Sequence, residues 1–300
     1  MLARTFLALV IAVSLAGAVR AAESDLSEAS PAELEAVISR IPANAQGEAA
    51  LRRAEALFRL GDLRGDVAMI RQGAAASGAV LAALETGGRG ALWVTANKDL
   101  GTALVMLARR TNDRSRLDEA IAAFESATLF ARDSLPDQWA GLMNSLAIAQ
   151  WTKGTMARDV ASVRQATDTF RTALEKATGL DPRERVRIQV NMASALVEIA
   201  TVGSDPAPVE EAVTMLDAAL ASAGSLGLPA QTAIIQGNLA QALTVRGWHR
   251  QAAADVEKAI ELAKAAIAYW DSVGATDARD STEANLRQSY QVLTELYNAR

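Results

Sequence analysis

One asparagine recurs at a fixed interval along the chain, and this regularity constrains the fold more than any other feature of the sequence. The asparagines are spaced 47 residues apart, at Asn97, Asn144, Asn191, Asn238 and Asn285. Self-similarity at a period of about 20–50 residues is typical of stacked structural repeats. An array of such repeats presents an extended surface rather than one central pocket. The period therefore predicts a repeat architecture and an activity based on binding.

Two separate segments of the chain share this period once one residue of slack is allowed. The first contains a large apolar residue, called here the anchor, at spacings of 46, 46, 47 and 47 residues: Leu100, Leu146, Met192, Leu239 and Leu286. The second contains a small residue at matching spacings: Ala120, Ala166, Ala212 and Ala259. Because two separate segments keep the same period, the repeat is not a chance match.

Each repeat is expected to contain two α-helices joined by a turn. Apolar residues recur at three- and four-residue steps, as on one face of a helix, at Ile235, Leu239, Ala242 and Leu243. We expect turns at Asn112-Asp113, at Lys153-Gly154, at Gly203-Ser204-Asp205-Pro206 and at Gly247-Trp248-His249-Arg250. Downstream of residue 22 the sequence has no sustained alternation of apolar and polar residues, which would indicate a strand. The predicted fold class is all-α.

At these positions the chain resembles the tetratricopeptide repeat family. The first helix of that family has a Leu-Gly-x-x-Leu core, which occurs here as Leu100, Gly101 and Leu104. Its second helix has an Ala-x-x-x-Phe-x-x-Ala core, found at Ala120, Phe124, Ala127 and at Ala166, Phe170, Ala173. The family standard is roughly 34 residues, whereas HEAT repeats have about the length seen here. The paired alanine–phenylalanine helices favour a long tetratricopeptide variant over a HEAT repeat.

The resemblance implies a right-handed α-solenoid of helix–turn–helix units with a repeat of 46–47 residues. We expect residues 46–300 to form about five hairpins and a C-terminal capping helix. The first hairpin is expected to be degenerate, because the segment Gly73 to Gly78 lacks a large core residue. In the last helix we expect an apolar row opposite a polar cap face that contains Arg287. That apolar row contains Leu286, Tyr290, Leu293 and Tyr297.

A separate N-terminal capping helix is expected within residues 23–45. Ser30-Pro31-Ala32-Glu33 is a capping-box signature, in which the serine and the glutamate each bond to the other's backbone N–H. Pro42 disfavours helical backbone at the residue before it, so the helix should end there.

Residues 1–22 have the features of a secretory signal peptide. Arg4 is followed by a fifteen-residue, mostly apolar run that ends before Arg20, and the small residues Ala21 and Ala22 come next. A membrane span needs about 20 apolar residues, so a permanent anchor is the less favoured alternative. We expect cleavage near Ala21 or Ala22, no stable membrane span afterwards, and a periplasmic or secreted location.

The residue types needed for common catalytic and metal sites are scarce. The chain has no cysteine and only one histidine, His249, which excludes a cysteine nucleophile and the usual zinc sites. Neither a Gly-x-Ser-x-Gly elbow nor a glycine-rich phosphate loop occurs. The formal charge is −5 at pH 7 without basic clusters, which argues against nucleic acid as a partner. We therefore expect no catalytic residue, no metal and no cofactor.

The residue before each anchor is always polar, although its neighbours are apolar. These residues are Asp99, Ser145, Asn191, Asn238 and Asn285. In peptide-binding relatives such as kinesin light chains and bacterial quorum-sensing receptors, an asparagine here bonds the backbone of a bound peptide. The resemblance therefore implies a binding row on the concave face, where an amide could both donate and accept. In the alternative interpretation these amides pair with a neighbouring helix or with water.

The candidate binding residues all lie in the predicted first helices, which line the concave face in this family. They are Lys98, Asp99, Thr102, Asn144, Arg187, Asn191, Ser194, Asn238, Gln241, Asn285 and Gln288.

These patterns favour a non-enzymatic scaffold of the periplasm or cell envelope that binds a protein or peptide along its concave face. An alternative is an assembly subunit of an envelope complex that uses its ends or outer face and has no peptide groove. An enzyme with an unrecognised carboxylate site is a third and weaker hypothesis. The identity of the partner and the oligomeric state are left open.

Overall fold

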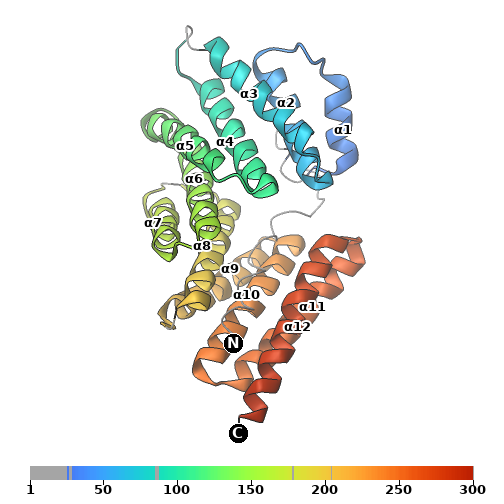
Figure 1. The fold of residues 1–300 in the computed structure, drawn as a ribbon, viewed down its shortest axis with the longest axis vertical. Helices are drawn as coiled ribbons and strands as arrows, with labels where there is room; N and C mark the ends of the chain where they lie inside the picture. The colour runs from blue at the N-terminus through green and yellow to red at the C-terminus, as the bar shows by residue number, and fades with distance from the viewer. Residues whose placement is uncertain (1–25, 27–28, 85–87, 178, 204, 300) are drawn as a thin grey trace. The chain divides into compact units, whose positions relative to one another are not determined.

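The computed structural model describes residues 26, 29–84, 88–177, 179–203 and 205–299. The expected signal peptide, residues 1–22, lies outside the described residues. Within the described ranges the chain forms α-helices and no strand (Figure 1). In chain order they are α1 (Pro31–Arg40), α2 (Gly47–Arg64), α3 (Val67–Leu84), α4 (Ala91–Thr111), α5 (Ser115–Ser134), α6 (Pro136–Ala157), α7 (Val160–Lys176), α8 (Pro182–Val202), α9 (Ala207–Ser225), α10 (Pro229–Arg250), α11 (Ala253–Val273) and α12 (Thr276–Asn298).

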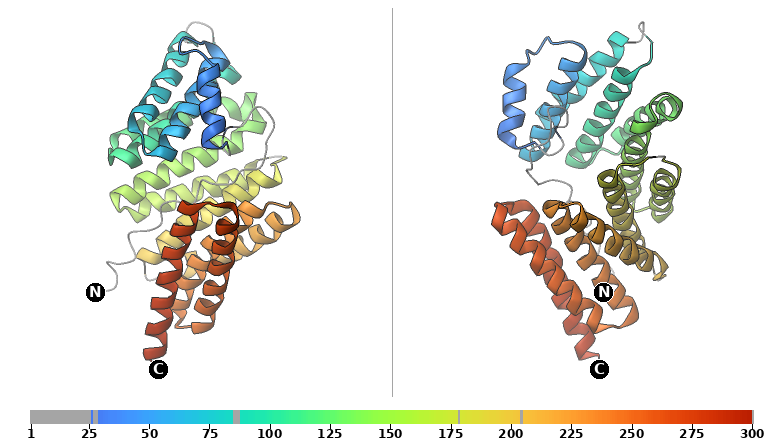
Figure 2. Two further views of the ribbon diagram at one scale, coloured as in Figure 1. Left: turned by 90° about the vertical axis from the view of Figure 1, so that its right-hand side faces the viewer. Right: turned by 180° about the vertical axis from the view of Figure 1, so that it is seen from behind.

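The helices from α2 to α11 are paired as successive hairpins, which α1 precedes and α12 follows. The described helices belong to two compact units, one from α1 to α7 and the other from α8 to α12. Two further views show the hairpins of each unit from the side and from behind (Figure 2). The predicted all-α, helical-repeat fold class is confirmed.

Each hairpin contributes one helix to an inner layer and one to an outer layer of its unit. We call the first helix of a hairpin its A helix and the second its B helix, and α12 occupies an A position. The A helices contact one another, α2 with α4 and α4 with α6 in one unit, α8 with α10 and α10 with α12 in the other. No contact of comparable extent joins B helices among the described residues, since these pack on A helices instead. The A helices are therefore the inner, more closely spaced layer of each unit.

The turn inside a hairpin recurs at one repeat position in the α4–α5, α6–α7 and α10–α11 hairpins, whereas α8 ends at Gly203 in extended backbone with a φ of −92°. The A helix ends in a left-handed residue twelve positions after the anchor, at Asn112, Arg158 and Gln251, with φ of 54°, 56° and 54°. Non-glycine residues adopt this backbone only rarely, which makes the recurrence a property of the turn. Of the expected turns, Asn112-Asp113 is confirmed, and Gly203, Asp205 and Pro206 lie between α8 and α9 as expected. Lys153-Gly154 and Gly247 to Arg250 lie inside α6 and α10.

The glycines in those two segments are there for close helix contact rather than for a turn. A Cβ atom on Gly154 would lie 2.9 Å from Val163 in α7, and one on Gly247 would lie 2.6 Å from Val256 in α11. Gly61 has the same role in the first hairpin, where a Cβ would lie 2.9 Å from Ile70. Such distances are shorter than van der Waals contact, so only glycine permits this spacing. The first hairpin therefore keeps the register of the others, although its B helix is degenerate.

The N-terminal capping helix begins with the expected capping box. The backbone N–H of Glu33 donates to the Ser30 hydroxyl at 3.3 Å, and the Ser30 N–H donates to the Glu33 carboxylate at 2.8 Å. Leu34 is the residue of α1 that is fully buried, against Ala56 and Leu60 of α2. This contact covers the apolar face of the first A helix.

The last helix packs differently from the prediction. Its buried row consists of Ala278, Thr282, Asn285, Ser289, Val292 and Leu296. Leu286 and Leu293 are half-buried, and Tyr290 and Tyr297 are exposed. The reason is that the apolar row faces the side on which a B helix would follow, and the described residues contain no helix there.

Among the described residues, α3 is long and apolar enough to cross a membrane, judged by length and composition alone, with a mean hydropathy of 1.4. In the structure it packs against α2 and α4, and Ile70 and Val80 are buried.

Candidate protein-interaction surface

The A helices of the second unit present polar residues at two repeat positions. One row directly precedes the anchors and comprises Asn191, Asn238 and Asn285; the other lies two residues after the anchors and comprises Ser194, Gln241 and Gln288. Because α8, α10 and α12 lie side by side, each row runs from helix to helix across the unit. All of these residues except Asn285 are half-exposed. We call this surface the amide face.

Asn285 does not belong to the accessible part of the amide face. It is 7% exposed, and its Oδ1 is buried without a hydrogen-bond partner. Asn144 is buried to a similar degree, with 5% exposure, and it has an interaction partner within the protein. For these two residues the alternative interpretation, packing among the helices, describes their position better than a row of ligand contacts.

Several hydroxyl groups in the predicted site bond to their own helix. The Thr102 hydroxyl donates to the carbonyl of Lys98 at 2.8 Å, and the Ser194 hydroxyl donates to the carbonyl of Val190 at 2.9 Å. These groups keep a free lone pair and can still accept a hydrogen bond. Arg187 is exposed on α8 and pairs with Glu184 of the same helix. The amides Asn238, Gln241 and Gln288 therefore carry most of the donor capacity of the amide face.

Two A helices of the first unit, α2 and α4, present ionisable residues on the inner layer, whereas α6 has Ser145 and Ile148 at the corresponding positions. Asp99 occupies the row before the anchor in α4, and its side chain is 3% exposed. The Lys98 ammonium lies 3.8 Å from its carboxylate. On the neighbouring α2, the Arg59 guanidinium donates to the Glu55 carboxylate at 2.8 Å. On α2 and α4 the inner layer of this unit is therefore polar through ionisable groups rather than amides.

Burial is the main influence on the Asp99 carboxyl. Removal from water is the largest cause that raises the pKa of Asp99, and the negative charge of Glu55 raises it as well; the net value is about 7. The positive charges of Lys98 and Arg59 act in the opposite direction and are weaker. Near neutral pH this carboxyl is therefore close to half-protonated, which is unusual for an aspartate. A side chain so deeply buried cannot present its charge to a partner from the surface.

Two charged residues of this layer, Glu55 and Arg59, were not predicted from the sequence. The signal was available, because Glu55 lies 47 residues before Thr102 and so falls in the row two residues after the anchors. It is easily overlooked, since the first hairpin lacks the large apolar residues by which the repeat is aligned.

His249 is also placed differently from the expectation of a solvated turn. It lies in the last turn of α10 and is half-buried. Its Nε2 lies 2.9 Å from the backbone oxygen of Ala200 in α8, so it joins consecutive A helices. This contact assigns the single histidine a structural role. No group of three or more histidine, cysteine, aspartate or glutamate residues suited to a metal ion occurs in the part of the chain that the structure describes.

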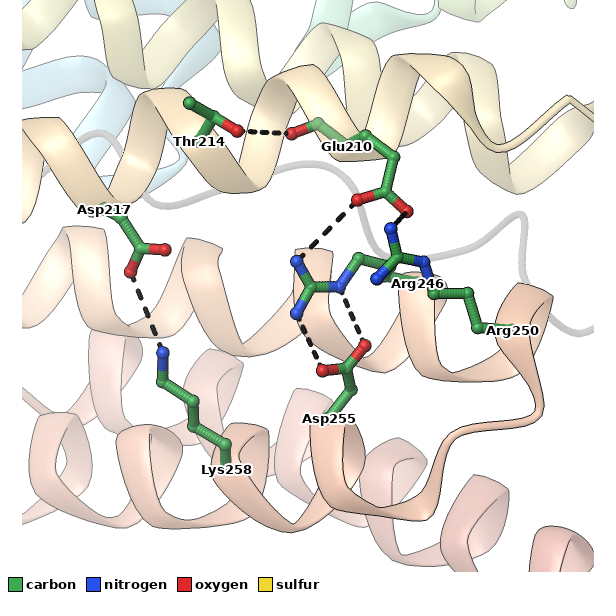
Figure 3. A network of polar contacts seen from close by, with 7 residues as sticks. All are labelled: Glu210, Thr214, Asp217, Arg246, Arg250, Asp255 and Lys258. Atoms are coloured by element: carbon green, nitrogen blue, oxygen red, sulfur yellow. Dashed lines mark hydrogen bonds and ion pairs between the residues drawn. The ribbon is translucent and has the colours of Figure 1, made fainter.

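A polar network joins α9, α10 and α11 (Figure 3). Arg246 donates from Nε and Nη2 to the two carboxylate oxygens of Asp255, both at 2.7 Å. Glu210 lies 3.8 Å from Arg246 and 2.7 Å from Arg250. The hydrogen bonds to Asp255 raise the pKa of Arg246 above its usual value, and the nearby carboxylates reinforce the shift. Because the charges are mutually paired, the network is a joint between hairpins rather than a free binding site.

No family model and no curated protein matches the chain. Solved structures do match. A single-substitution variant of a kinesin light chain-type protein from Podosopora anserina, with nearly identical TPR-like repeats, has a TM-score of 0.52 at 18% identity, covering 75% of this chain and 96% of that one. A second structure of that protein gives a TM-score of 0.51 at 18% identity, with coverages of 71% and 94%. At this identity the likeness concerns the fold alone, and by that measure the chain has a tetratricopeptide-like helical repeat fold.

Proposed function

We propose that this protein is a non-enzymatic scaffold that binds an extended segment of a partner protein across the amide face. The observation that carries the proposal is the repetition of half-exposed polar side chains at equivalent positions on three adjacent A helices. A peptide backbone offers N–H and C=O groups at regular intervals. Amide side chains can satisfy both kinds of group whatever the peptide sequence.

The amide face of the second unit has little free charge, which favours a partner that is bound through its backbone rather than through charged side chains. Asn238, Gln241 and Gln288 are neutral, and the nearest predicted charge, Arg187, already pairs with Glu184. Salt should therefore have a modest effect on binding at this face, because there is little net charge to screen. A partner held mainly by ion pairs would behave differently.

The experiment is affinity capture with a triple variant, Asn238→Ala, Gln241→Ala and Gln288→Ala. Each lost amide contact is worth about 0.5–1.5 kcal/mol, so the triple variant should bind an identified partner at least about tenfold more weakly. Asn285 is kept intact because it is buried, and its truncation would disturb packing. Affinity is measured by isothermal titration calorimetry after the wild-type chain has captured the partner.

The matched control removes three polar groups from the exposed faces of B helices: Thr214→Ala, Lys258→Ala and Glu261→Ala. This variant should bind the partner as the wild type does. If the B-helix variant loses the partner and the amide-face variant keeps it, the protein acts through its outer layer, as an assembly subunit would.

We also propose that the protein is exported and acts in the periplasm or outside the cell. The support is the signal-like sequence of residues 1–22. Mass spectrometry of the protein recovered from cell fractions tests this proposal. A mature N-terminus near Ala22 in the exported fraction is expected, and an intact Met1 in the cytoplasmic fraction would contradict it.

A further inference from the structure

The surface formed by α11 and α12 contains an open groove of about 420 Å³. Its floor is apolar and includes Ile267, Leu286 and Tyr290. The Lys264 ammonium lies 5.7 Å from the centre of the Tyr290 ring. This groove lies between an A position and the preceding B helix, and it is separate from the half-exposed residues of the amide face.

The repeat shows that the residues of this groove are normally covered. Leu286 and Tyr290 correspond to Leu239 and Leu243 of the preceding A helix, 47 residues earlier. Leu239 and Leu243 are 0% exposed in α10, which packs against both α9 and α11. Tyr290, in contrast, is 44% exposed. The α11–α12 surface therefore has an uncovered apolar patch at positions that are fully buried one repeat earlier.

A further B helix packed as closely as α11 does not suit this surface. The residue after the anchor is small in each preceding A helix, at Gly101, Ala147, Ala193 and Ala240. A Cβ on Gly101 would already lie 2.7 Å from the Phe124 ring of its B helix, which shows how near the two helices come at this position. In α12 the position is occupied by Arg287. Such a long side chain favours a more open contact than a sixth hairpin would make.

The charged residues of the groove are separated by sign along its length. Asp271 and Glu283 mark one end, since both lie near the same guanidinium, that of Arg279, at 3.7 and 3.9 Å. Lys264 marks the other end, over the Tyr290 ring. Arg287 lies one helical turn after Glu283, towards that positive end, at 3.7 Å from the Glu283 carboxylate. The groove therefore has an acidic end, an apolar middle and a basic end.

A surface with one acidic end and one basic end is complementary to a second copy of itself when a two-fold axis through its middle relates the two copies. The acidic end of each copy then faces the basic end of the other. We propose that the α11–α12 surface binds a second copy of this chain as a symmetric dimer. The axis passes near Leu286 and Ile267, so that Lys264 of one protomer faces Glu283 of the other. A two-fold interface uses the same patch on both protomers, as this arrangement requires. The apolar floor of one groove then covers that of the other.

Sedimentation velocity over a concentration series tests the dimer, with a pair of charge reversals as the decisive variants. The chain should dimerise in a concentration-dependent way. Lys264→Glu and Glu283→Lys should each raise the dissociation constant of the dimer at least about tenfold, because like charges then face each other. The double variant Lys264→Glu/Glu283→Lys restores opposite charges and should dimerise nearly as well as the wild type. All the altered side chains are exposed, and circular dichroism checks that each variant is folded.

A chain that stays monomeric at about 0.2 mM, far above a micromolar dissociation constant, would overturn the proposal. A dimer that none of the three variants weakens would overturn it as well, because it would lie elsewhere on the molecule. Either failure leaves the amide face untouched, since Asn238, Gln241 and Gln288 are not altered.

Discussion

At the scale of single residues, Asp99 is the most unusual group in the inner layer. A carboxyl on a side chain that is 3% exposed, with the Lys98 ammonium 3.8 Å away, is destabilised in its charged form. The residues at the equivalent position of the following repeats are uncharged. The repeat pattern therefore groups Asp99 with uncharged polar residues by position alone. The structure shows that the common position does not give these residues a common environment.

Replacing Asp99 with asparagine should stabilise the protein above neutral pH. The pKa of Asp99 is raised from 3.8 to about 7, so between these pH values the folded state binds more protons than the unfolded state. Stability of the wild type therefore falls as pH rises through this window. Asp99→Asn removes the dependence and should gain up to about 4 kcal/mol at pH 8, with little gain below pH 4. Urea unfolding at both pH values measures this difference, and an equal gain at each would contradict the assigned cause.

The contact between Gly101 and Phe124 sets the distance between the helices of one hairpin. A methyl group at Gly101 would lie 2.7 Å from the Phe124 ring. Gly101→Ala should therefore cost about 1–3 kcal/mol by overpacking. The double variant Gly101→Ala/Phe124→Leu recreates the pair formed by Ala193 and Leu216 two hairpins later. It should be more stable than the sum of the single variants predicts, and simple additivity in chemical denaturation would count against this contact.

At the scale of elements, neighbouring hairpins are joined by a recurring polar contact. Lys153 and Arg246 both lie seven residues after their anchors, and each pairs with an acid of the preceding B helix, Asp118 or Glu210. Tyr297 makes the corresponding contact with Glu257 from one turn further along its helix. Position 164, which corresponds to these acids, is an arginine. The polar contacts between hairpins therefore recur at similar repeat positions, but the residue types that form them differ.

The joint at Arg246 should contribute more stability than the joint at Lys153. Besides its contact with Glu210 of the preceding hairpin, Arg246 forms two hydrogen bonds with Asp255 of its own hairpin. These Arg246 and Asp255 side chains are 18% and 19% exposed, whereas Lys153 and Asp118 are 45% and 64% exposed. Arg246→Met should cost about 2 kcal/mol because it leaves a half-buried carboxylate without its partner. Lys153→Met should cost about 0–1 kcal/mol. Thermal melting of the two variants compares them, and equal losses would show that burial does not govern these joints.

The helix boundaries illustrate what the sequence could and could not predict at this scale. The period placed the A and B helices correctly, and Asn112 correctly marked a turn because asparagine tolerates left-handed backbone. Gly154 and Gly247 were assigned to turns because glycine often occurs there. In the structure they allow two helices to touch, with the turns following at Arg158 and Gln251. A single sequence cannot distinguish these two uses of glycine, since both require the absence of a side chain.

At the scale of the whole molecule, the repeat predicted the fold class but not the environment of each candidate residue. Asn191 and Asn238 are half-exposed as a binding row requires, whereas Asn144 and Asn285 are buried. Burial depends on which neighbours a residue meets in three dimensions, and these differ between a middle helix and an end helix. The period also did not predict the division into two units, because the spacing of the anchors is the same before residue 180 and across it.

The central claim is that the inner layer of A helices, and not the outer layer of B helices, binds the partner. Photo-crosslinking tests it directly, with a benzophenone amino acid placed singly at Asn238 or Gln241 on α10, and at Ala218 on α9 or Ala265 on α11 as outer-layer controls. We predict a covalent adduct with the identified partner from the two α10 positions and none from the controls. Adducts from Ala218 and Ala265 but not from Asn238 and Gln241 would contradict the account.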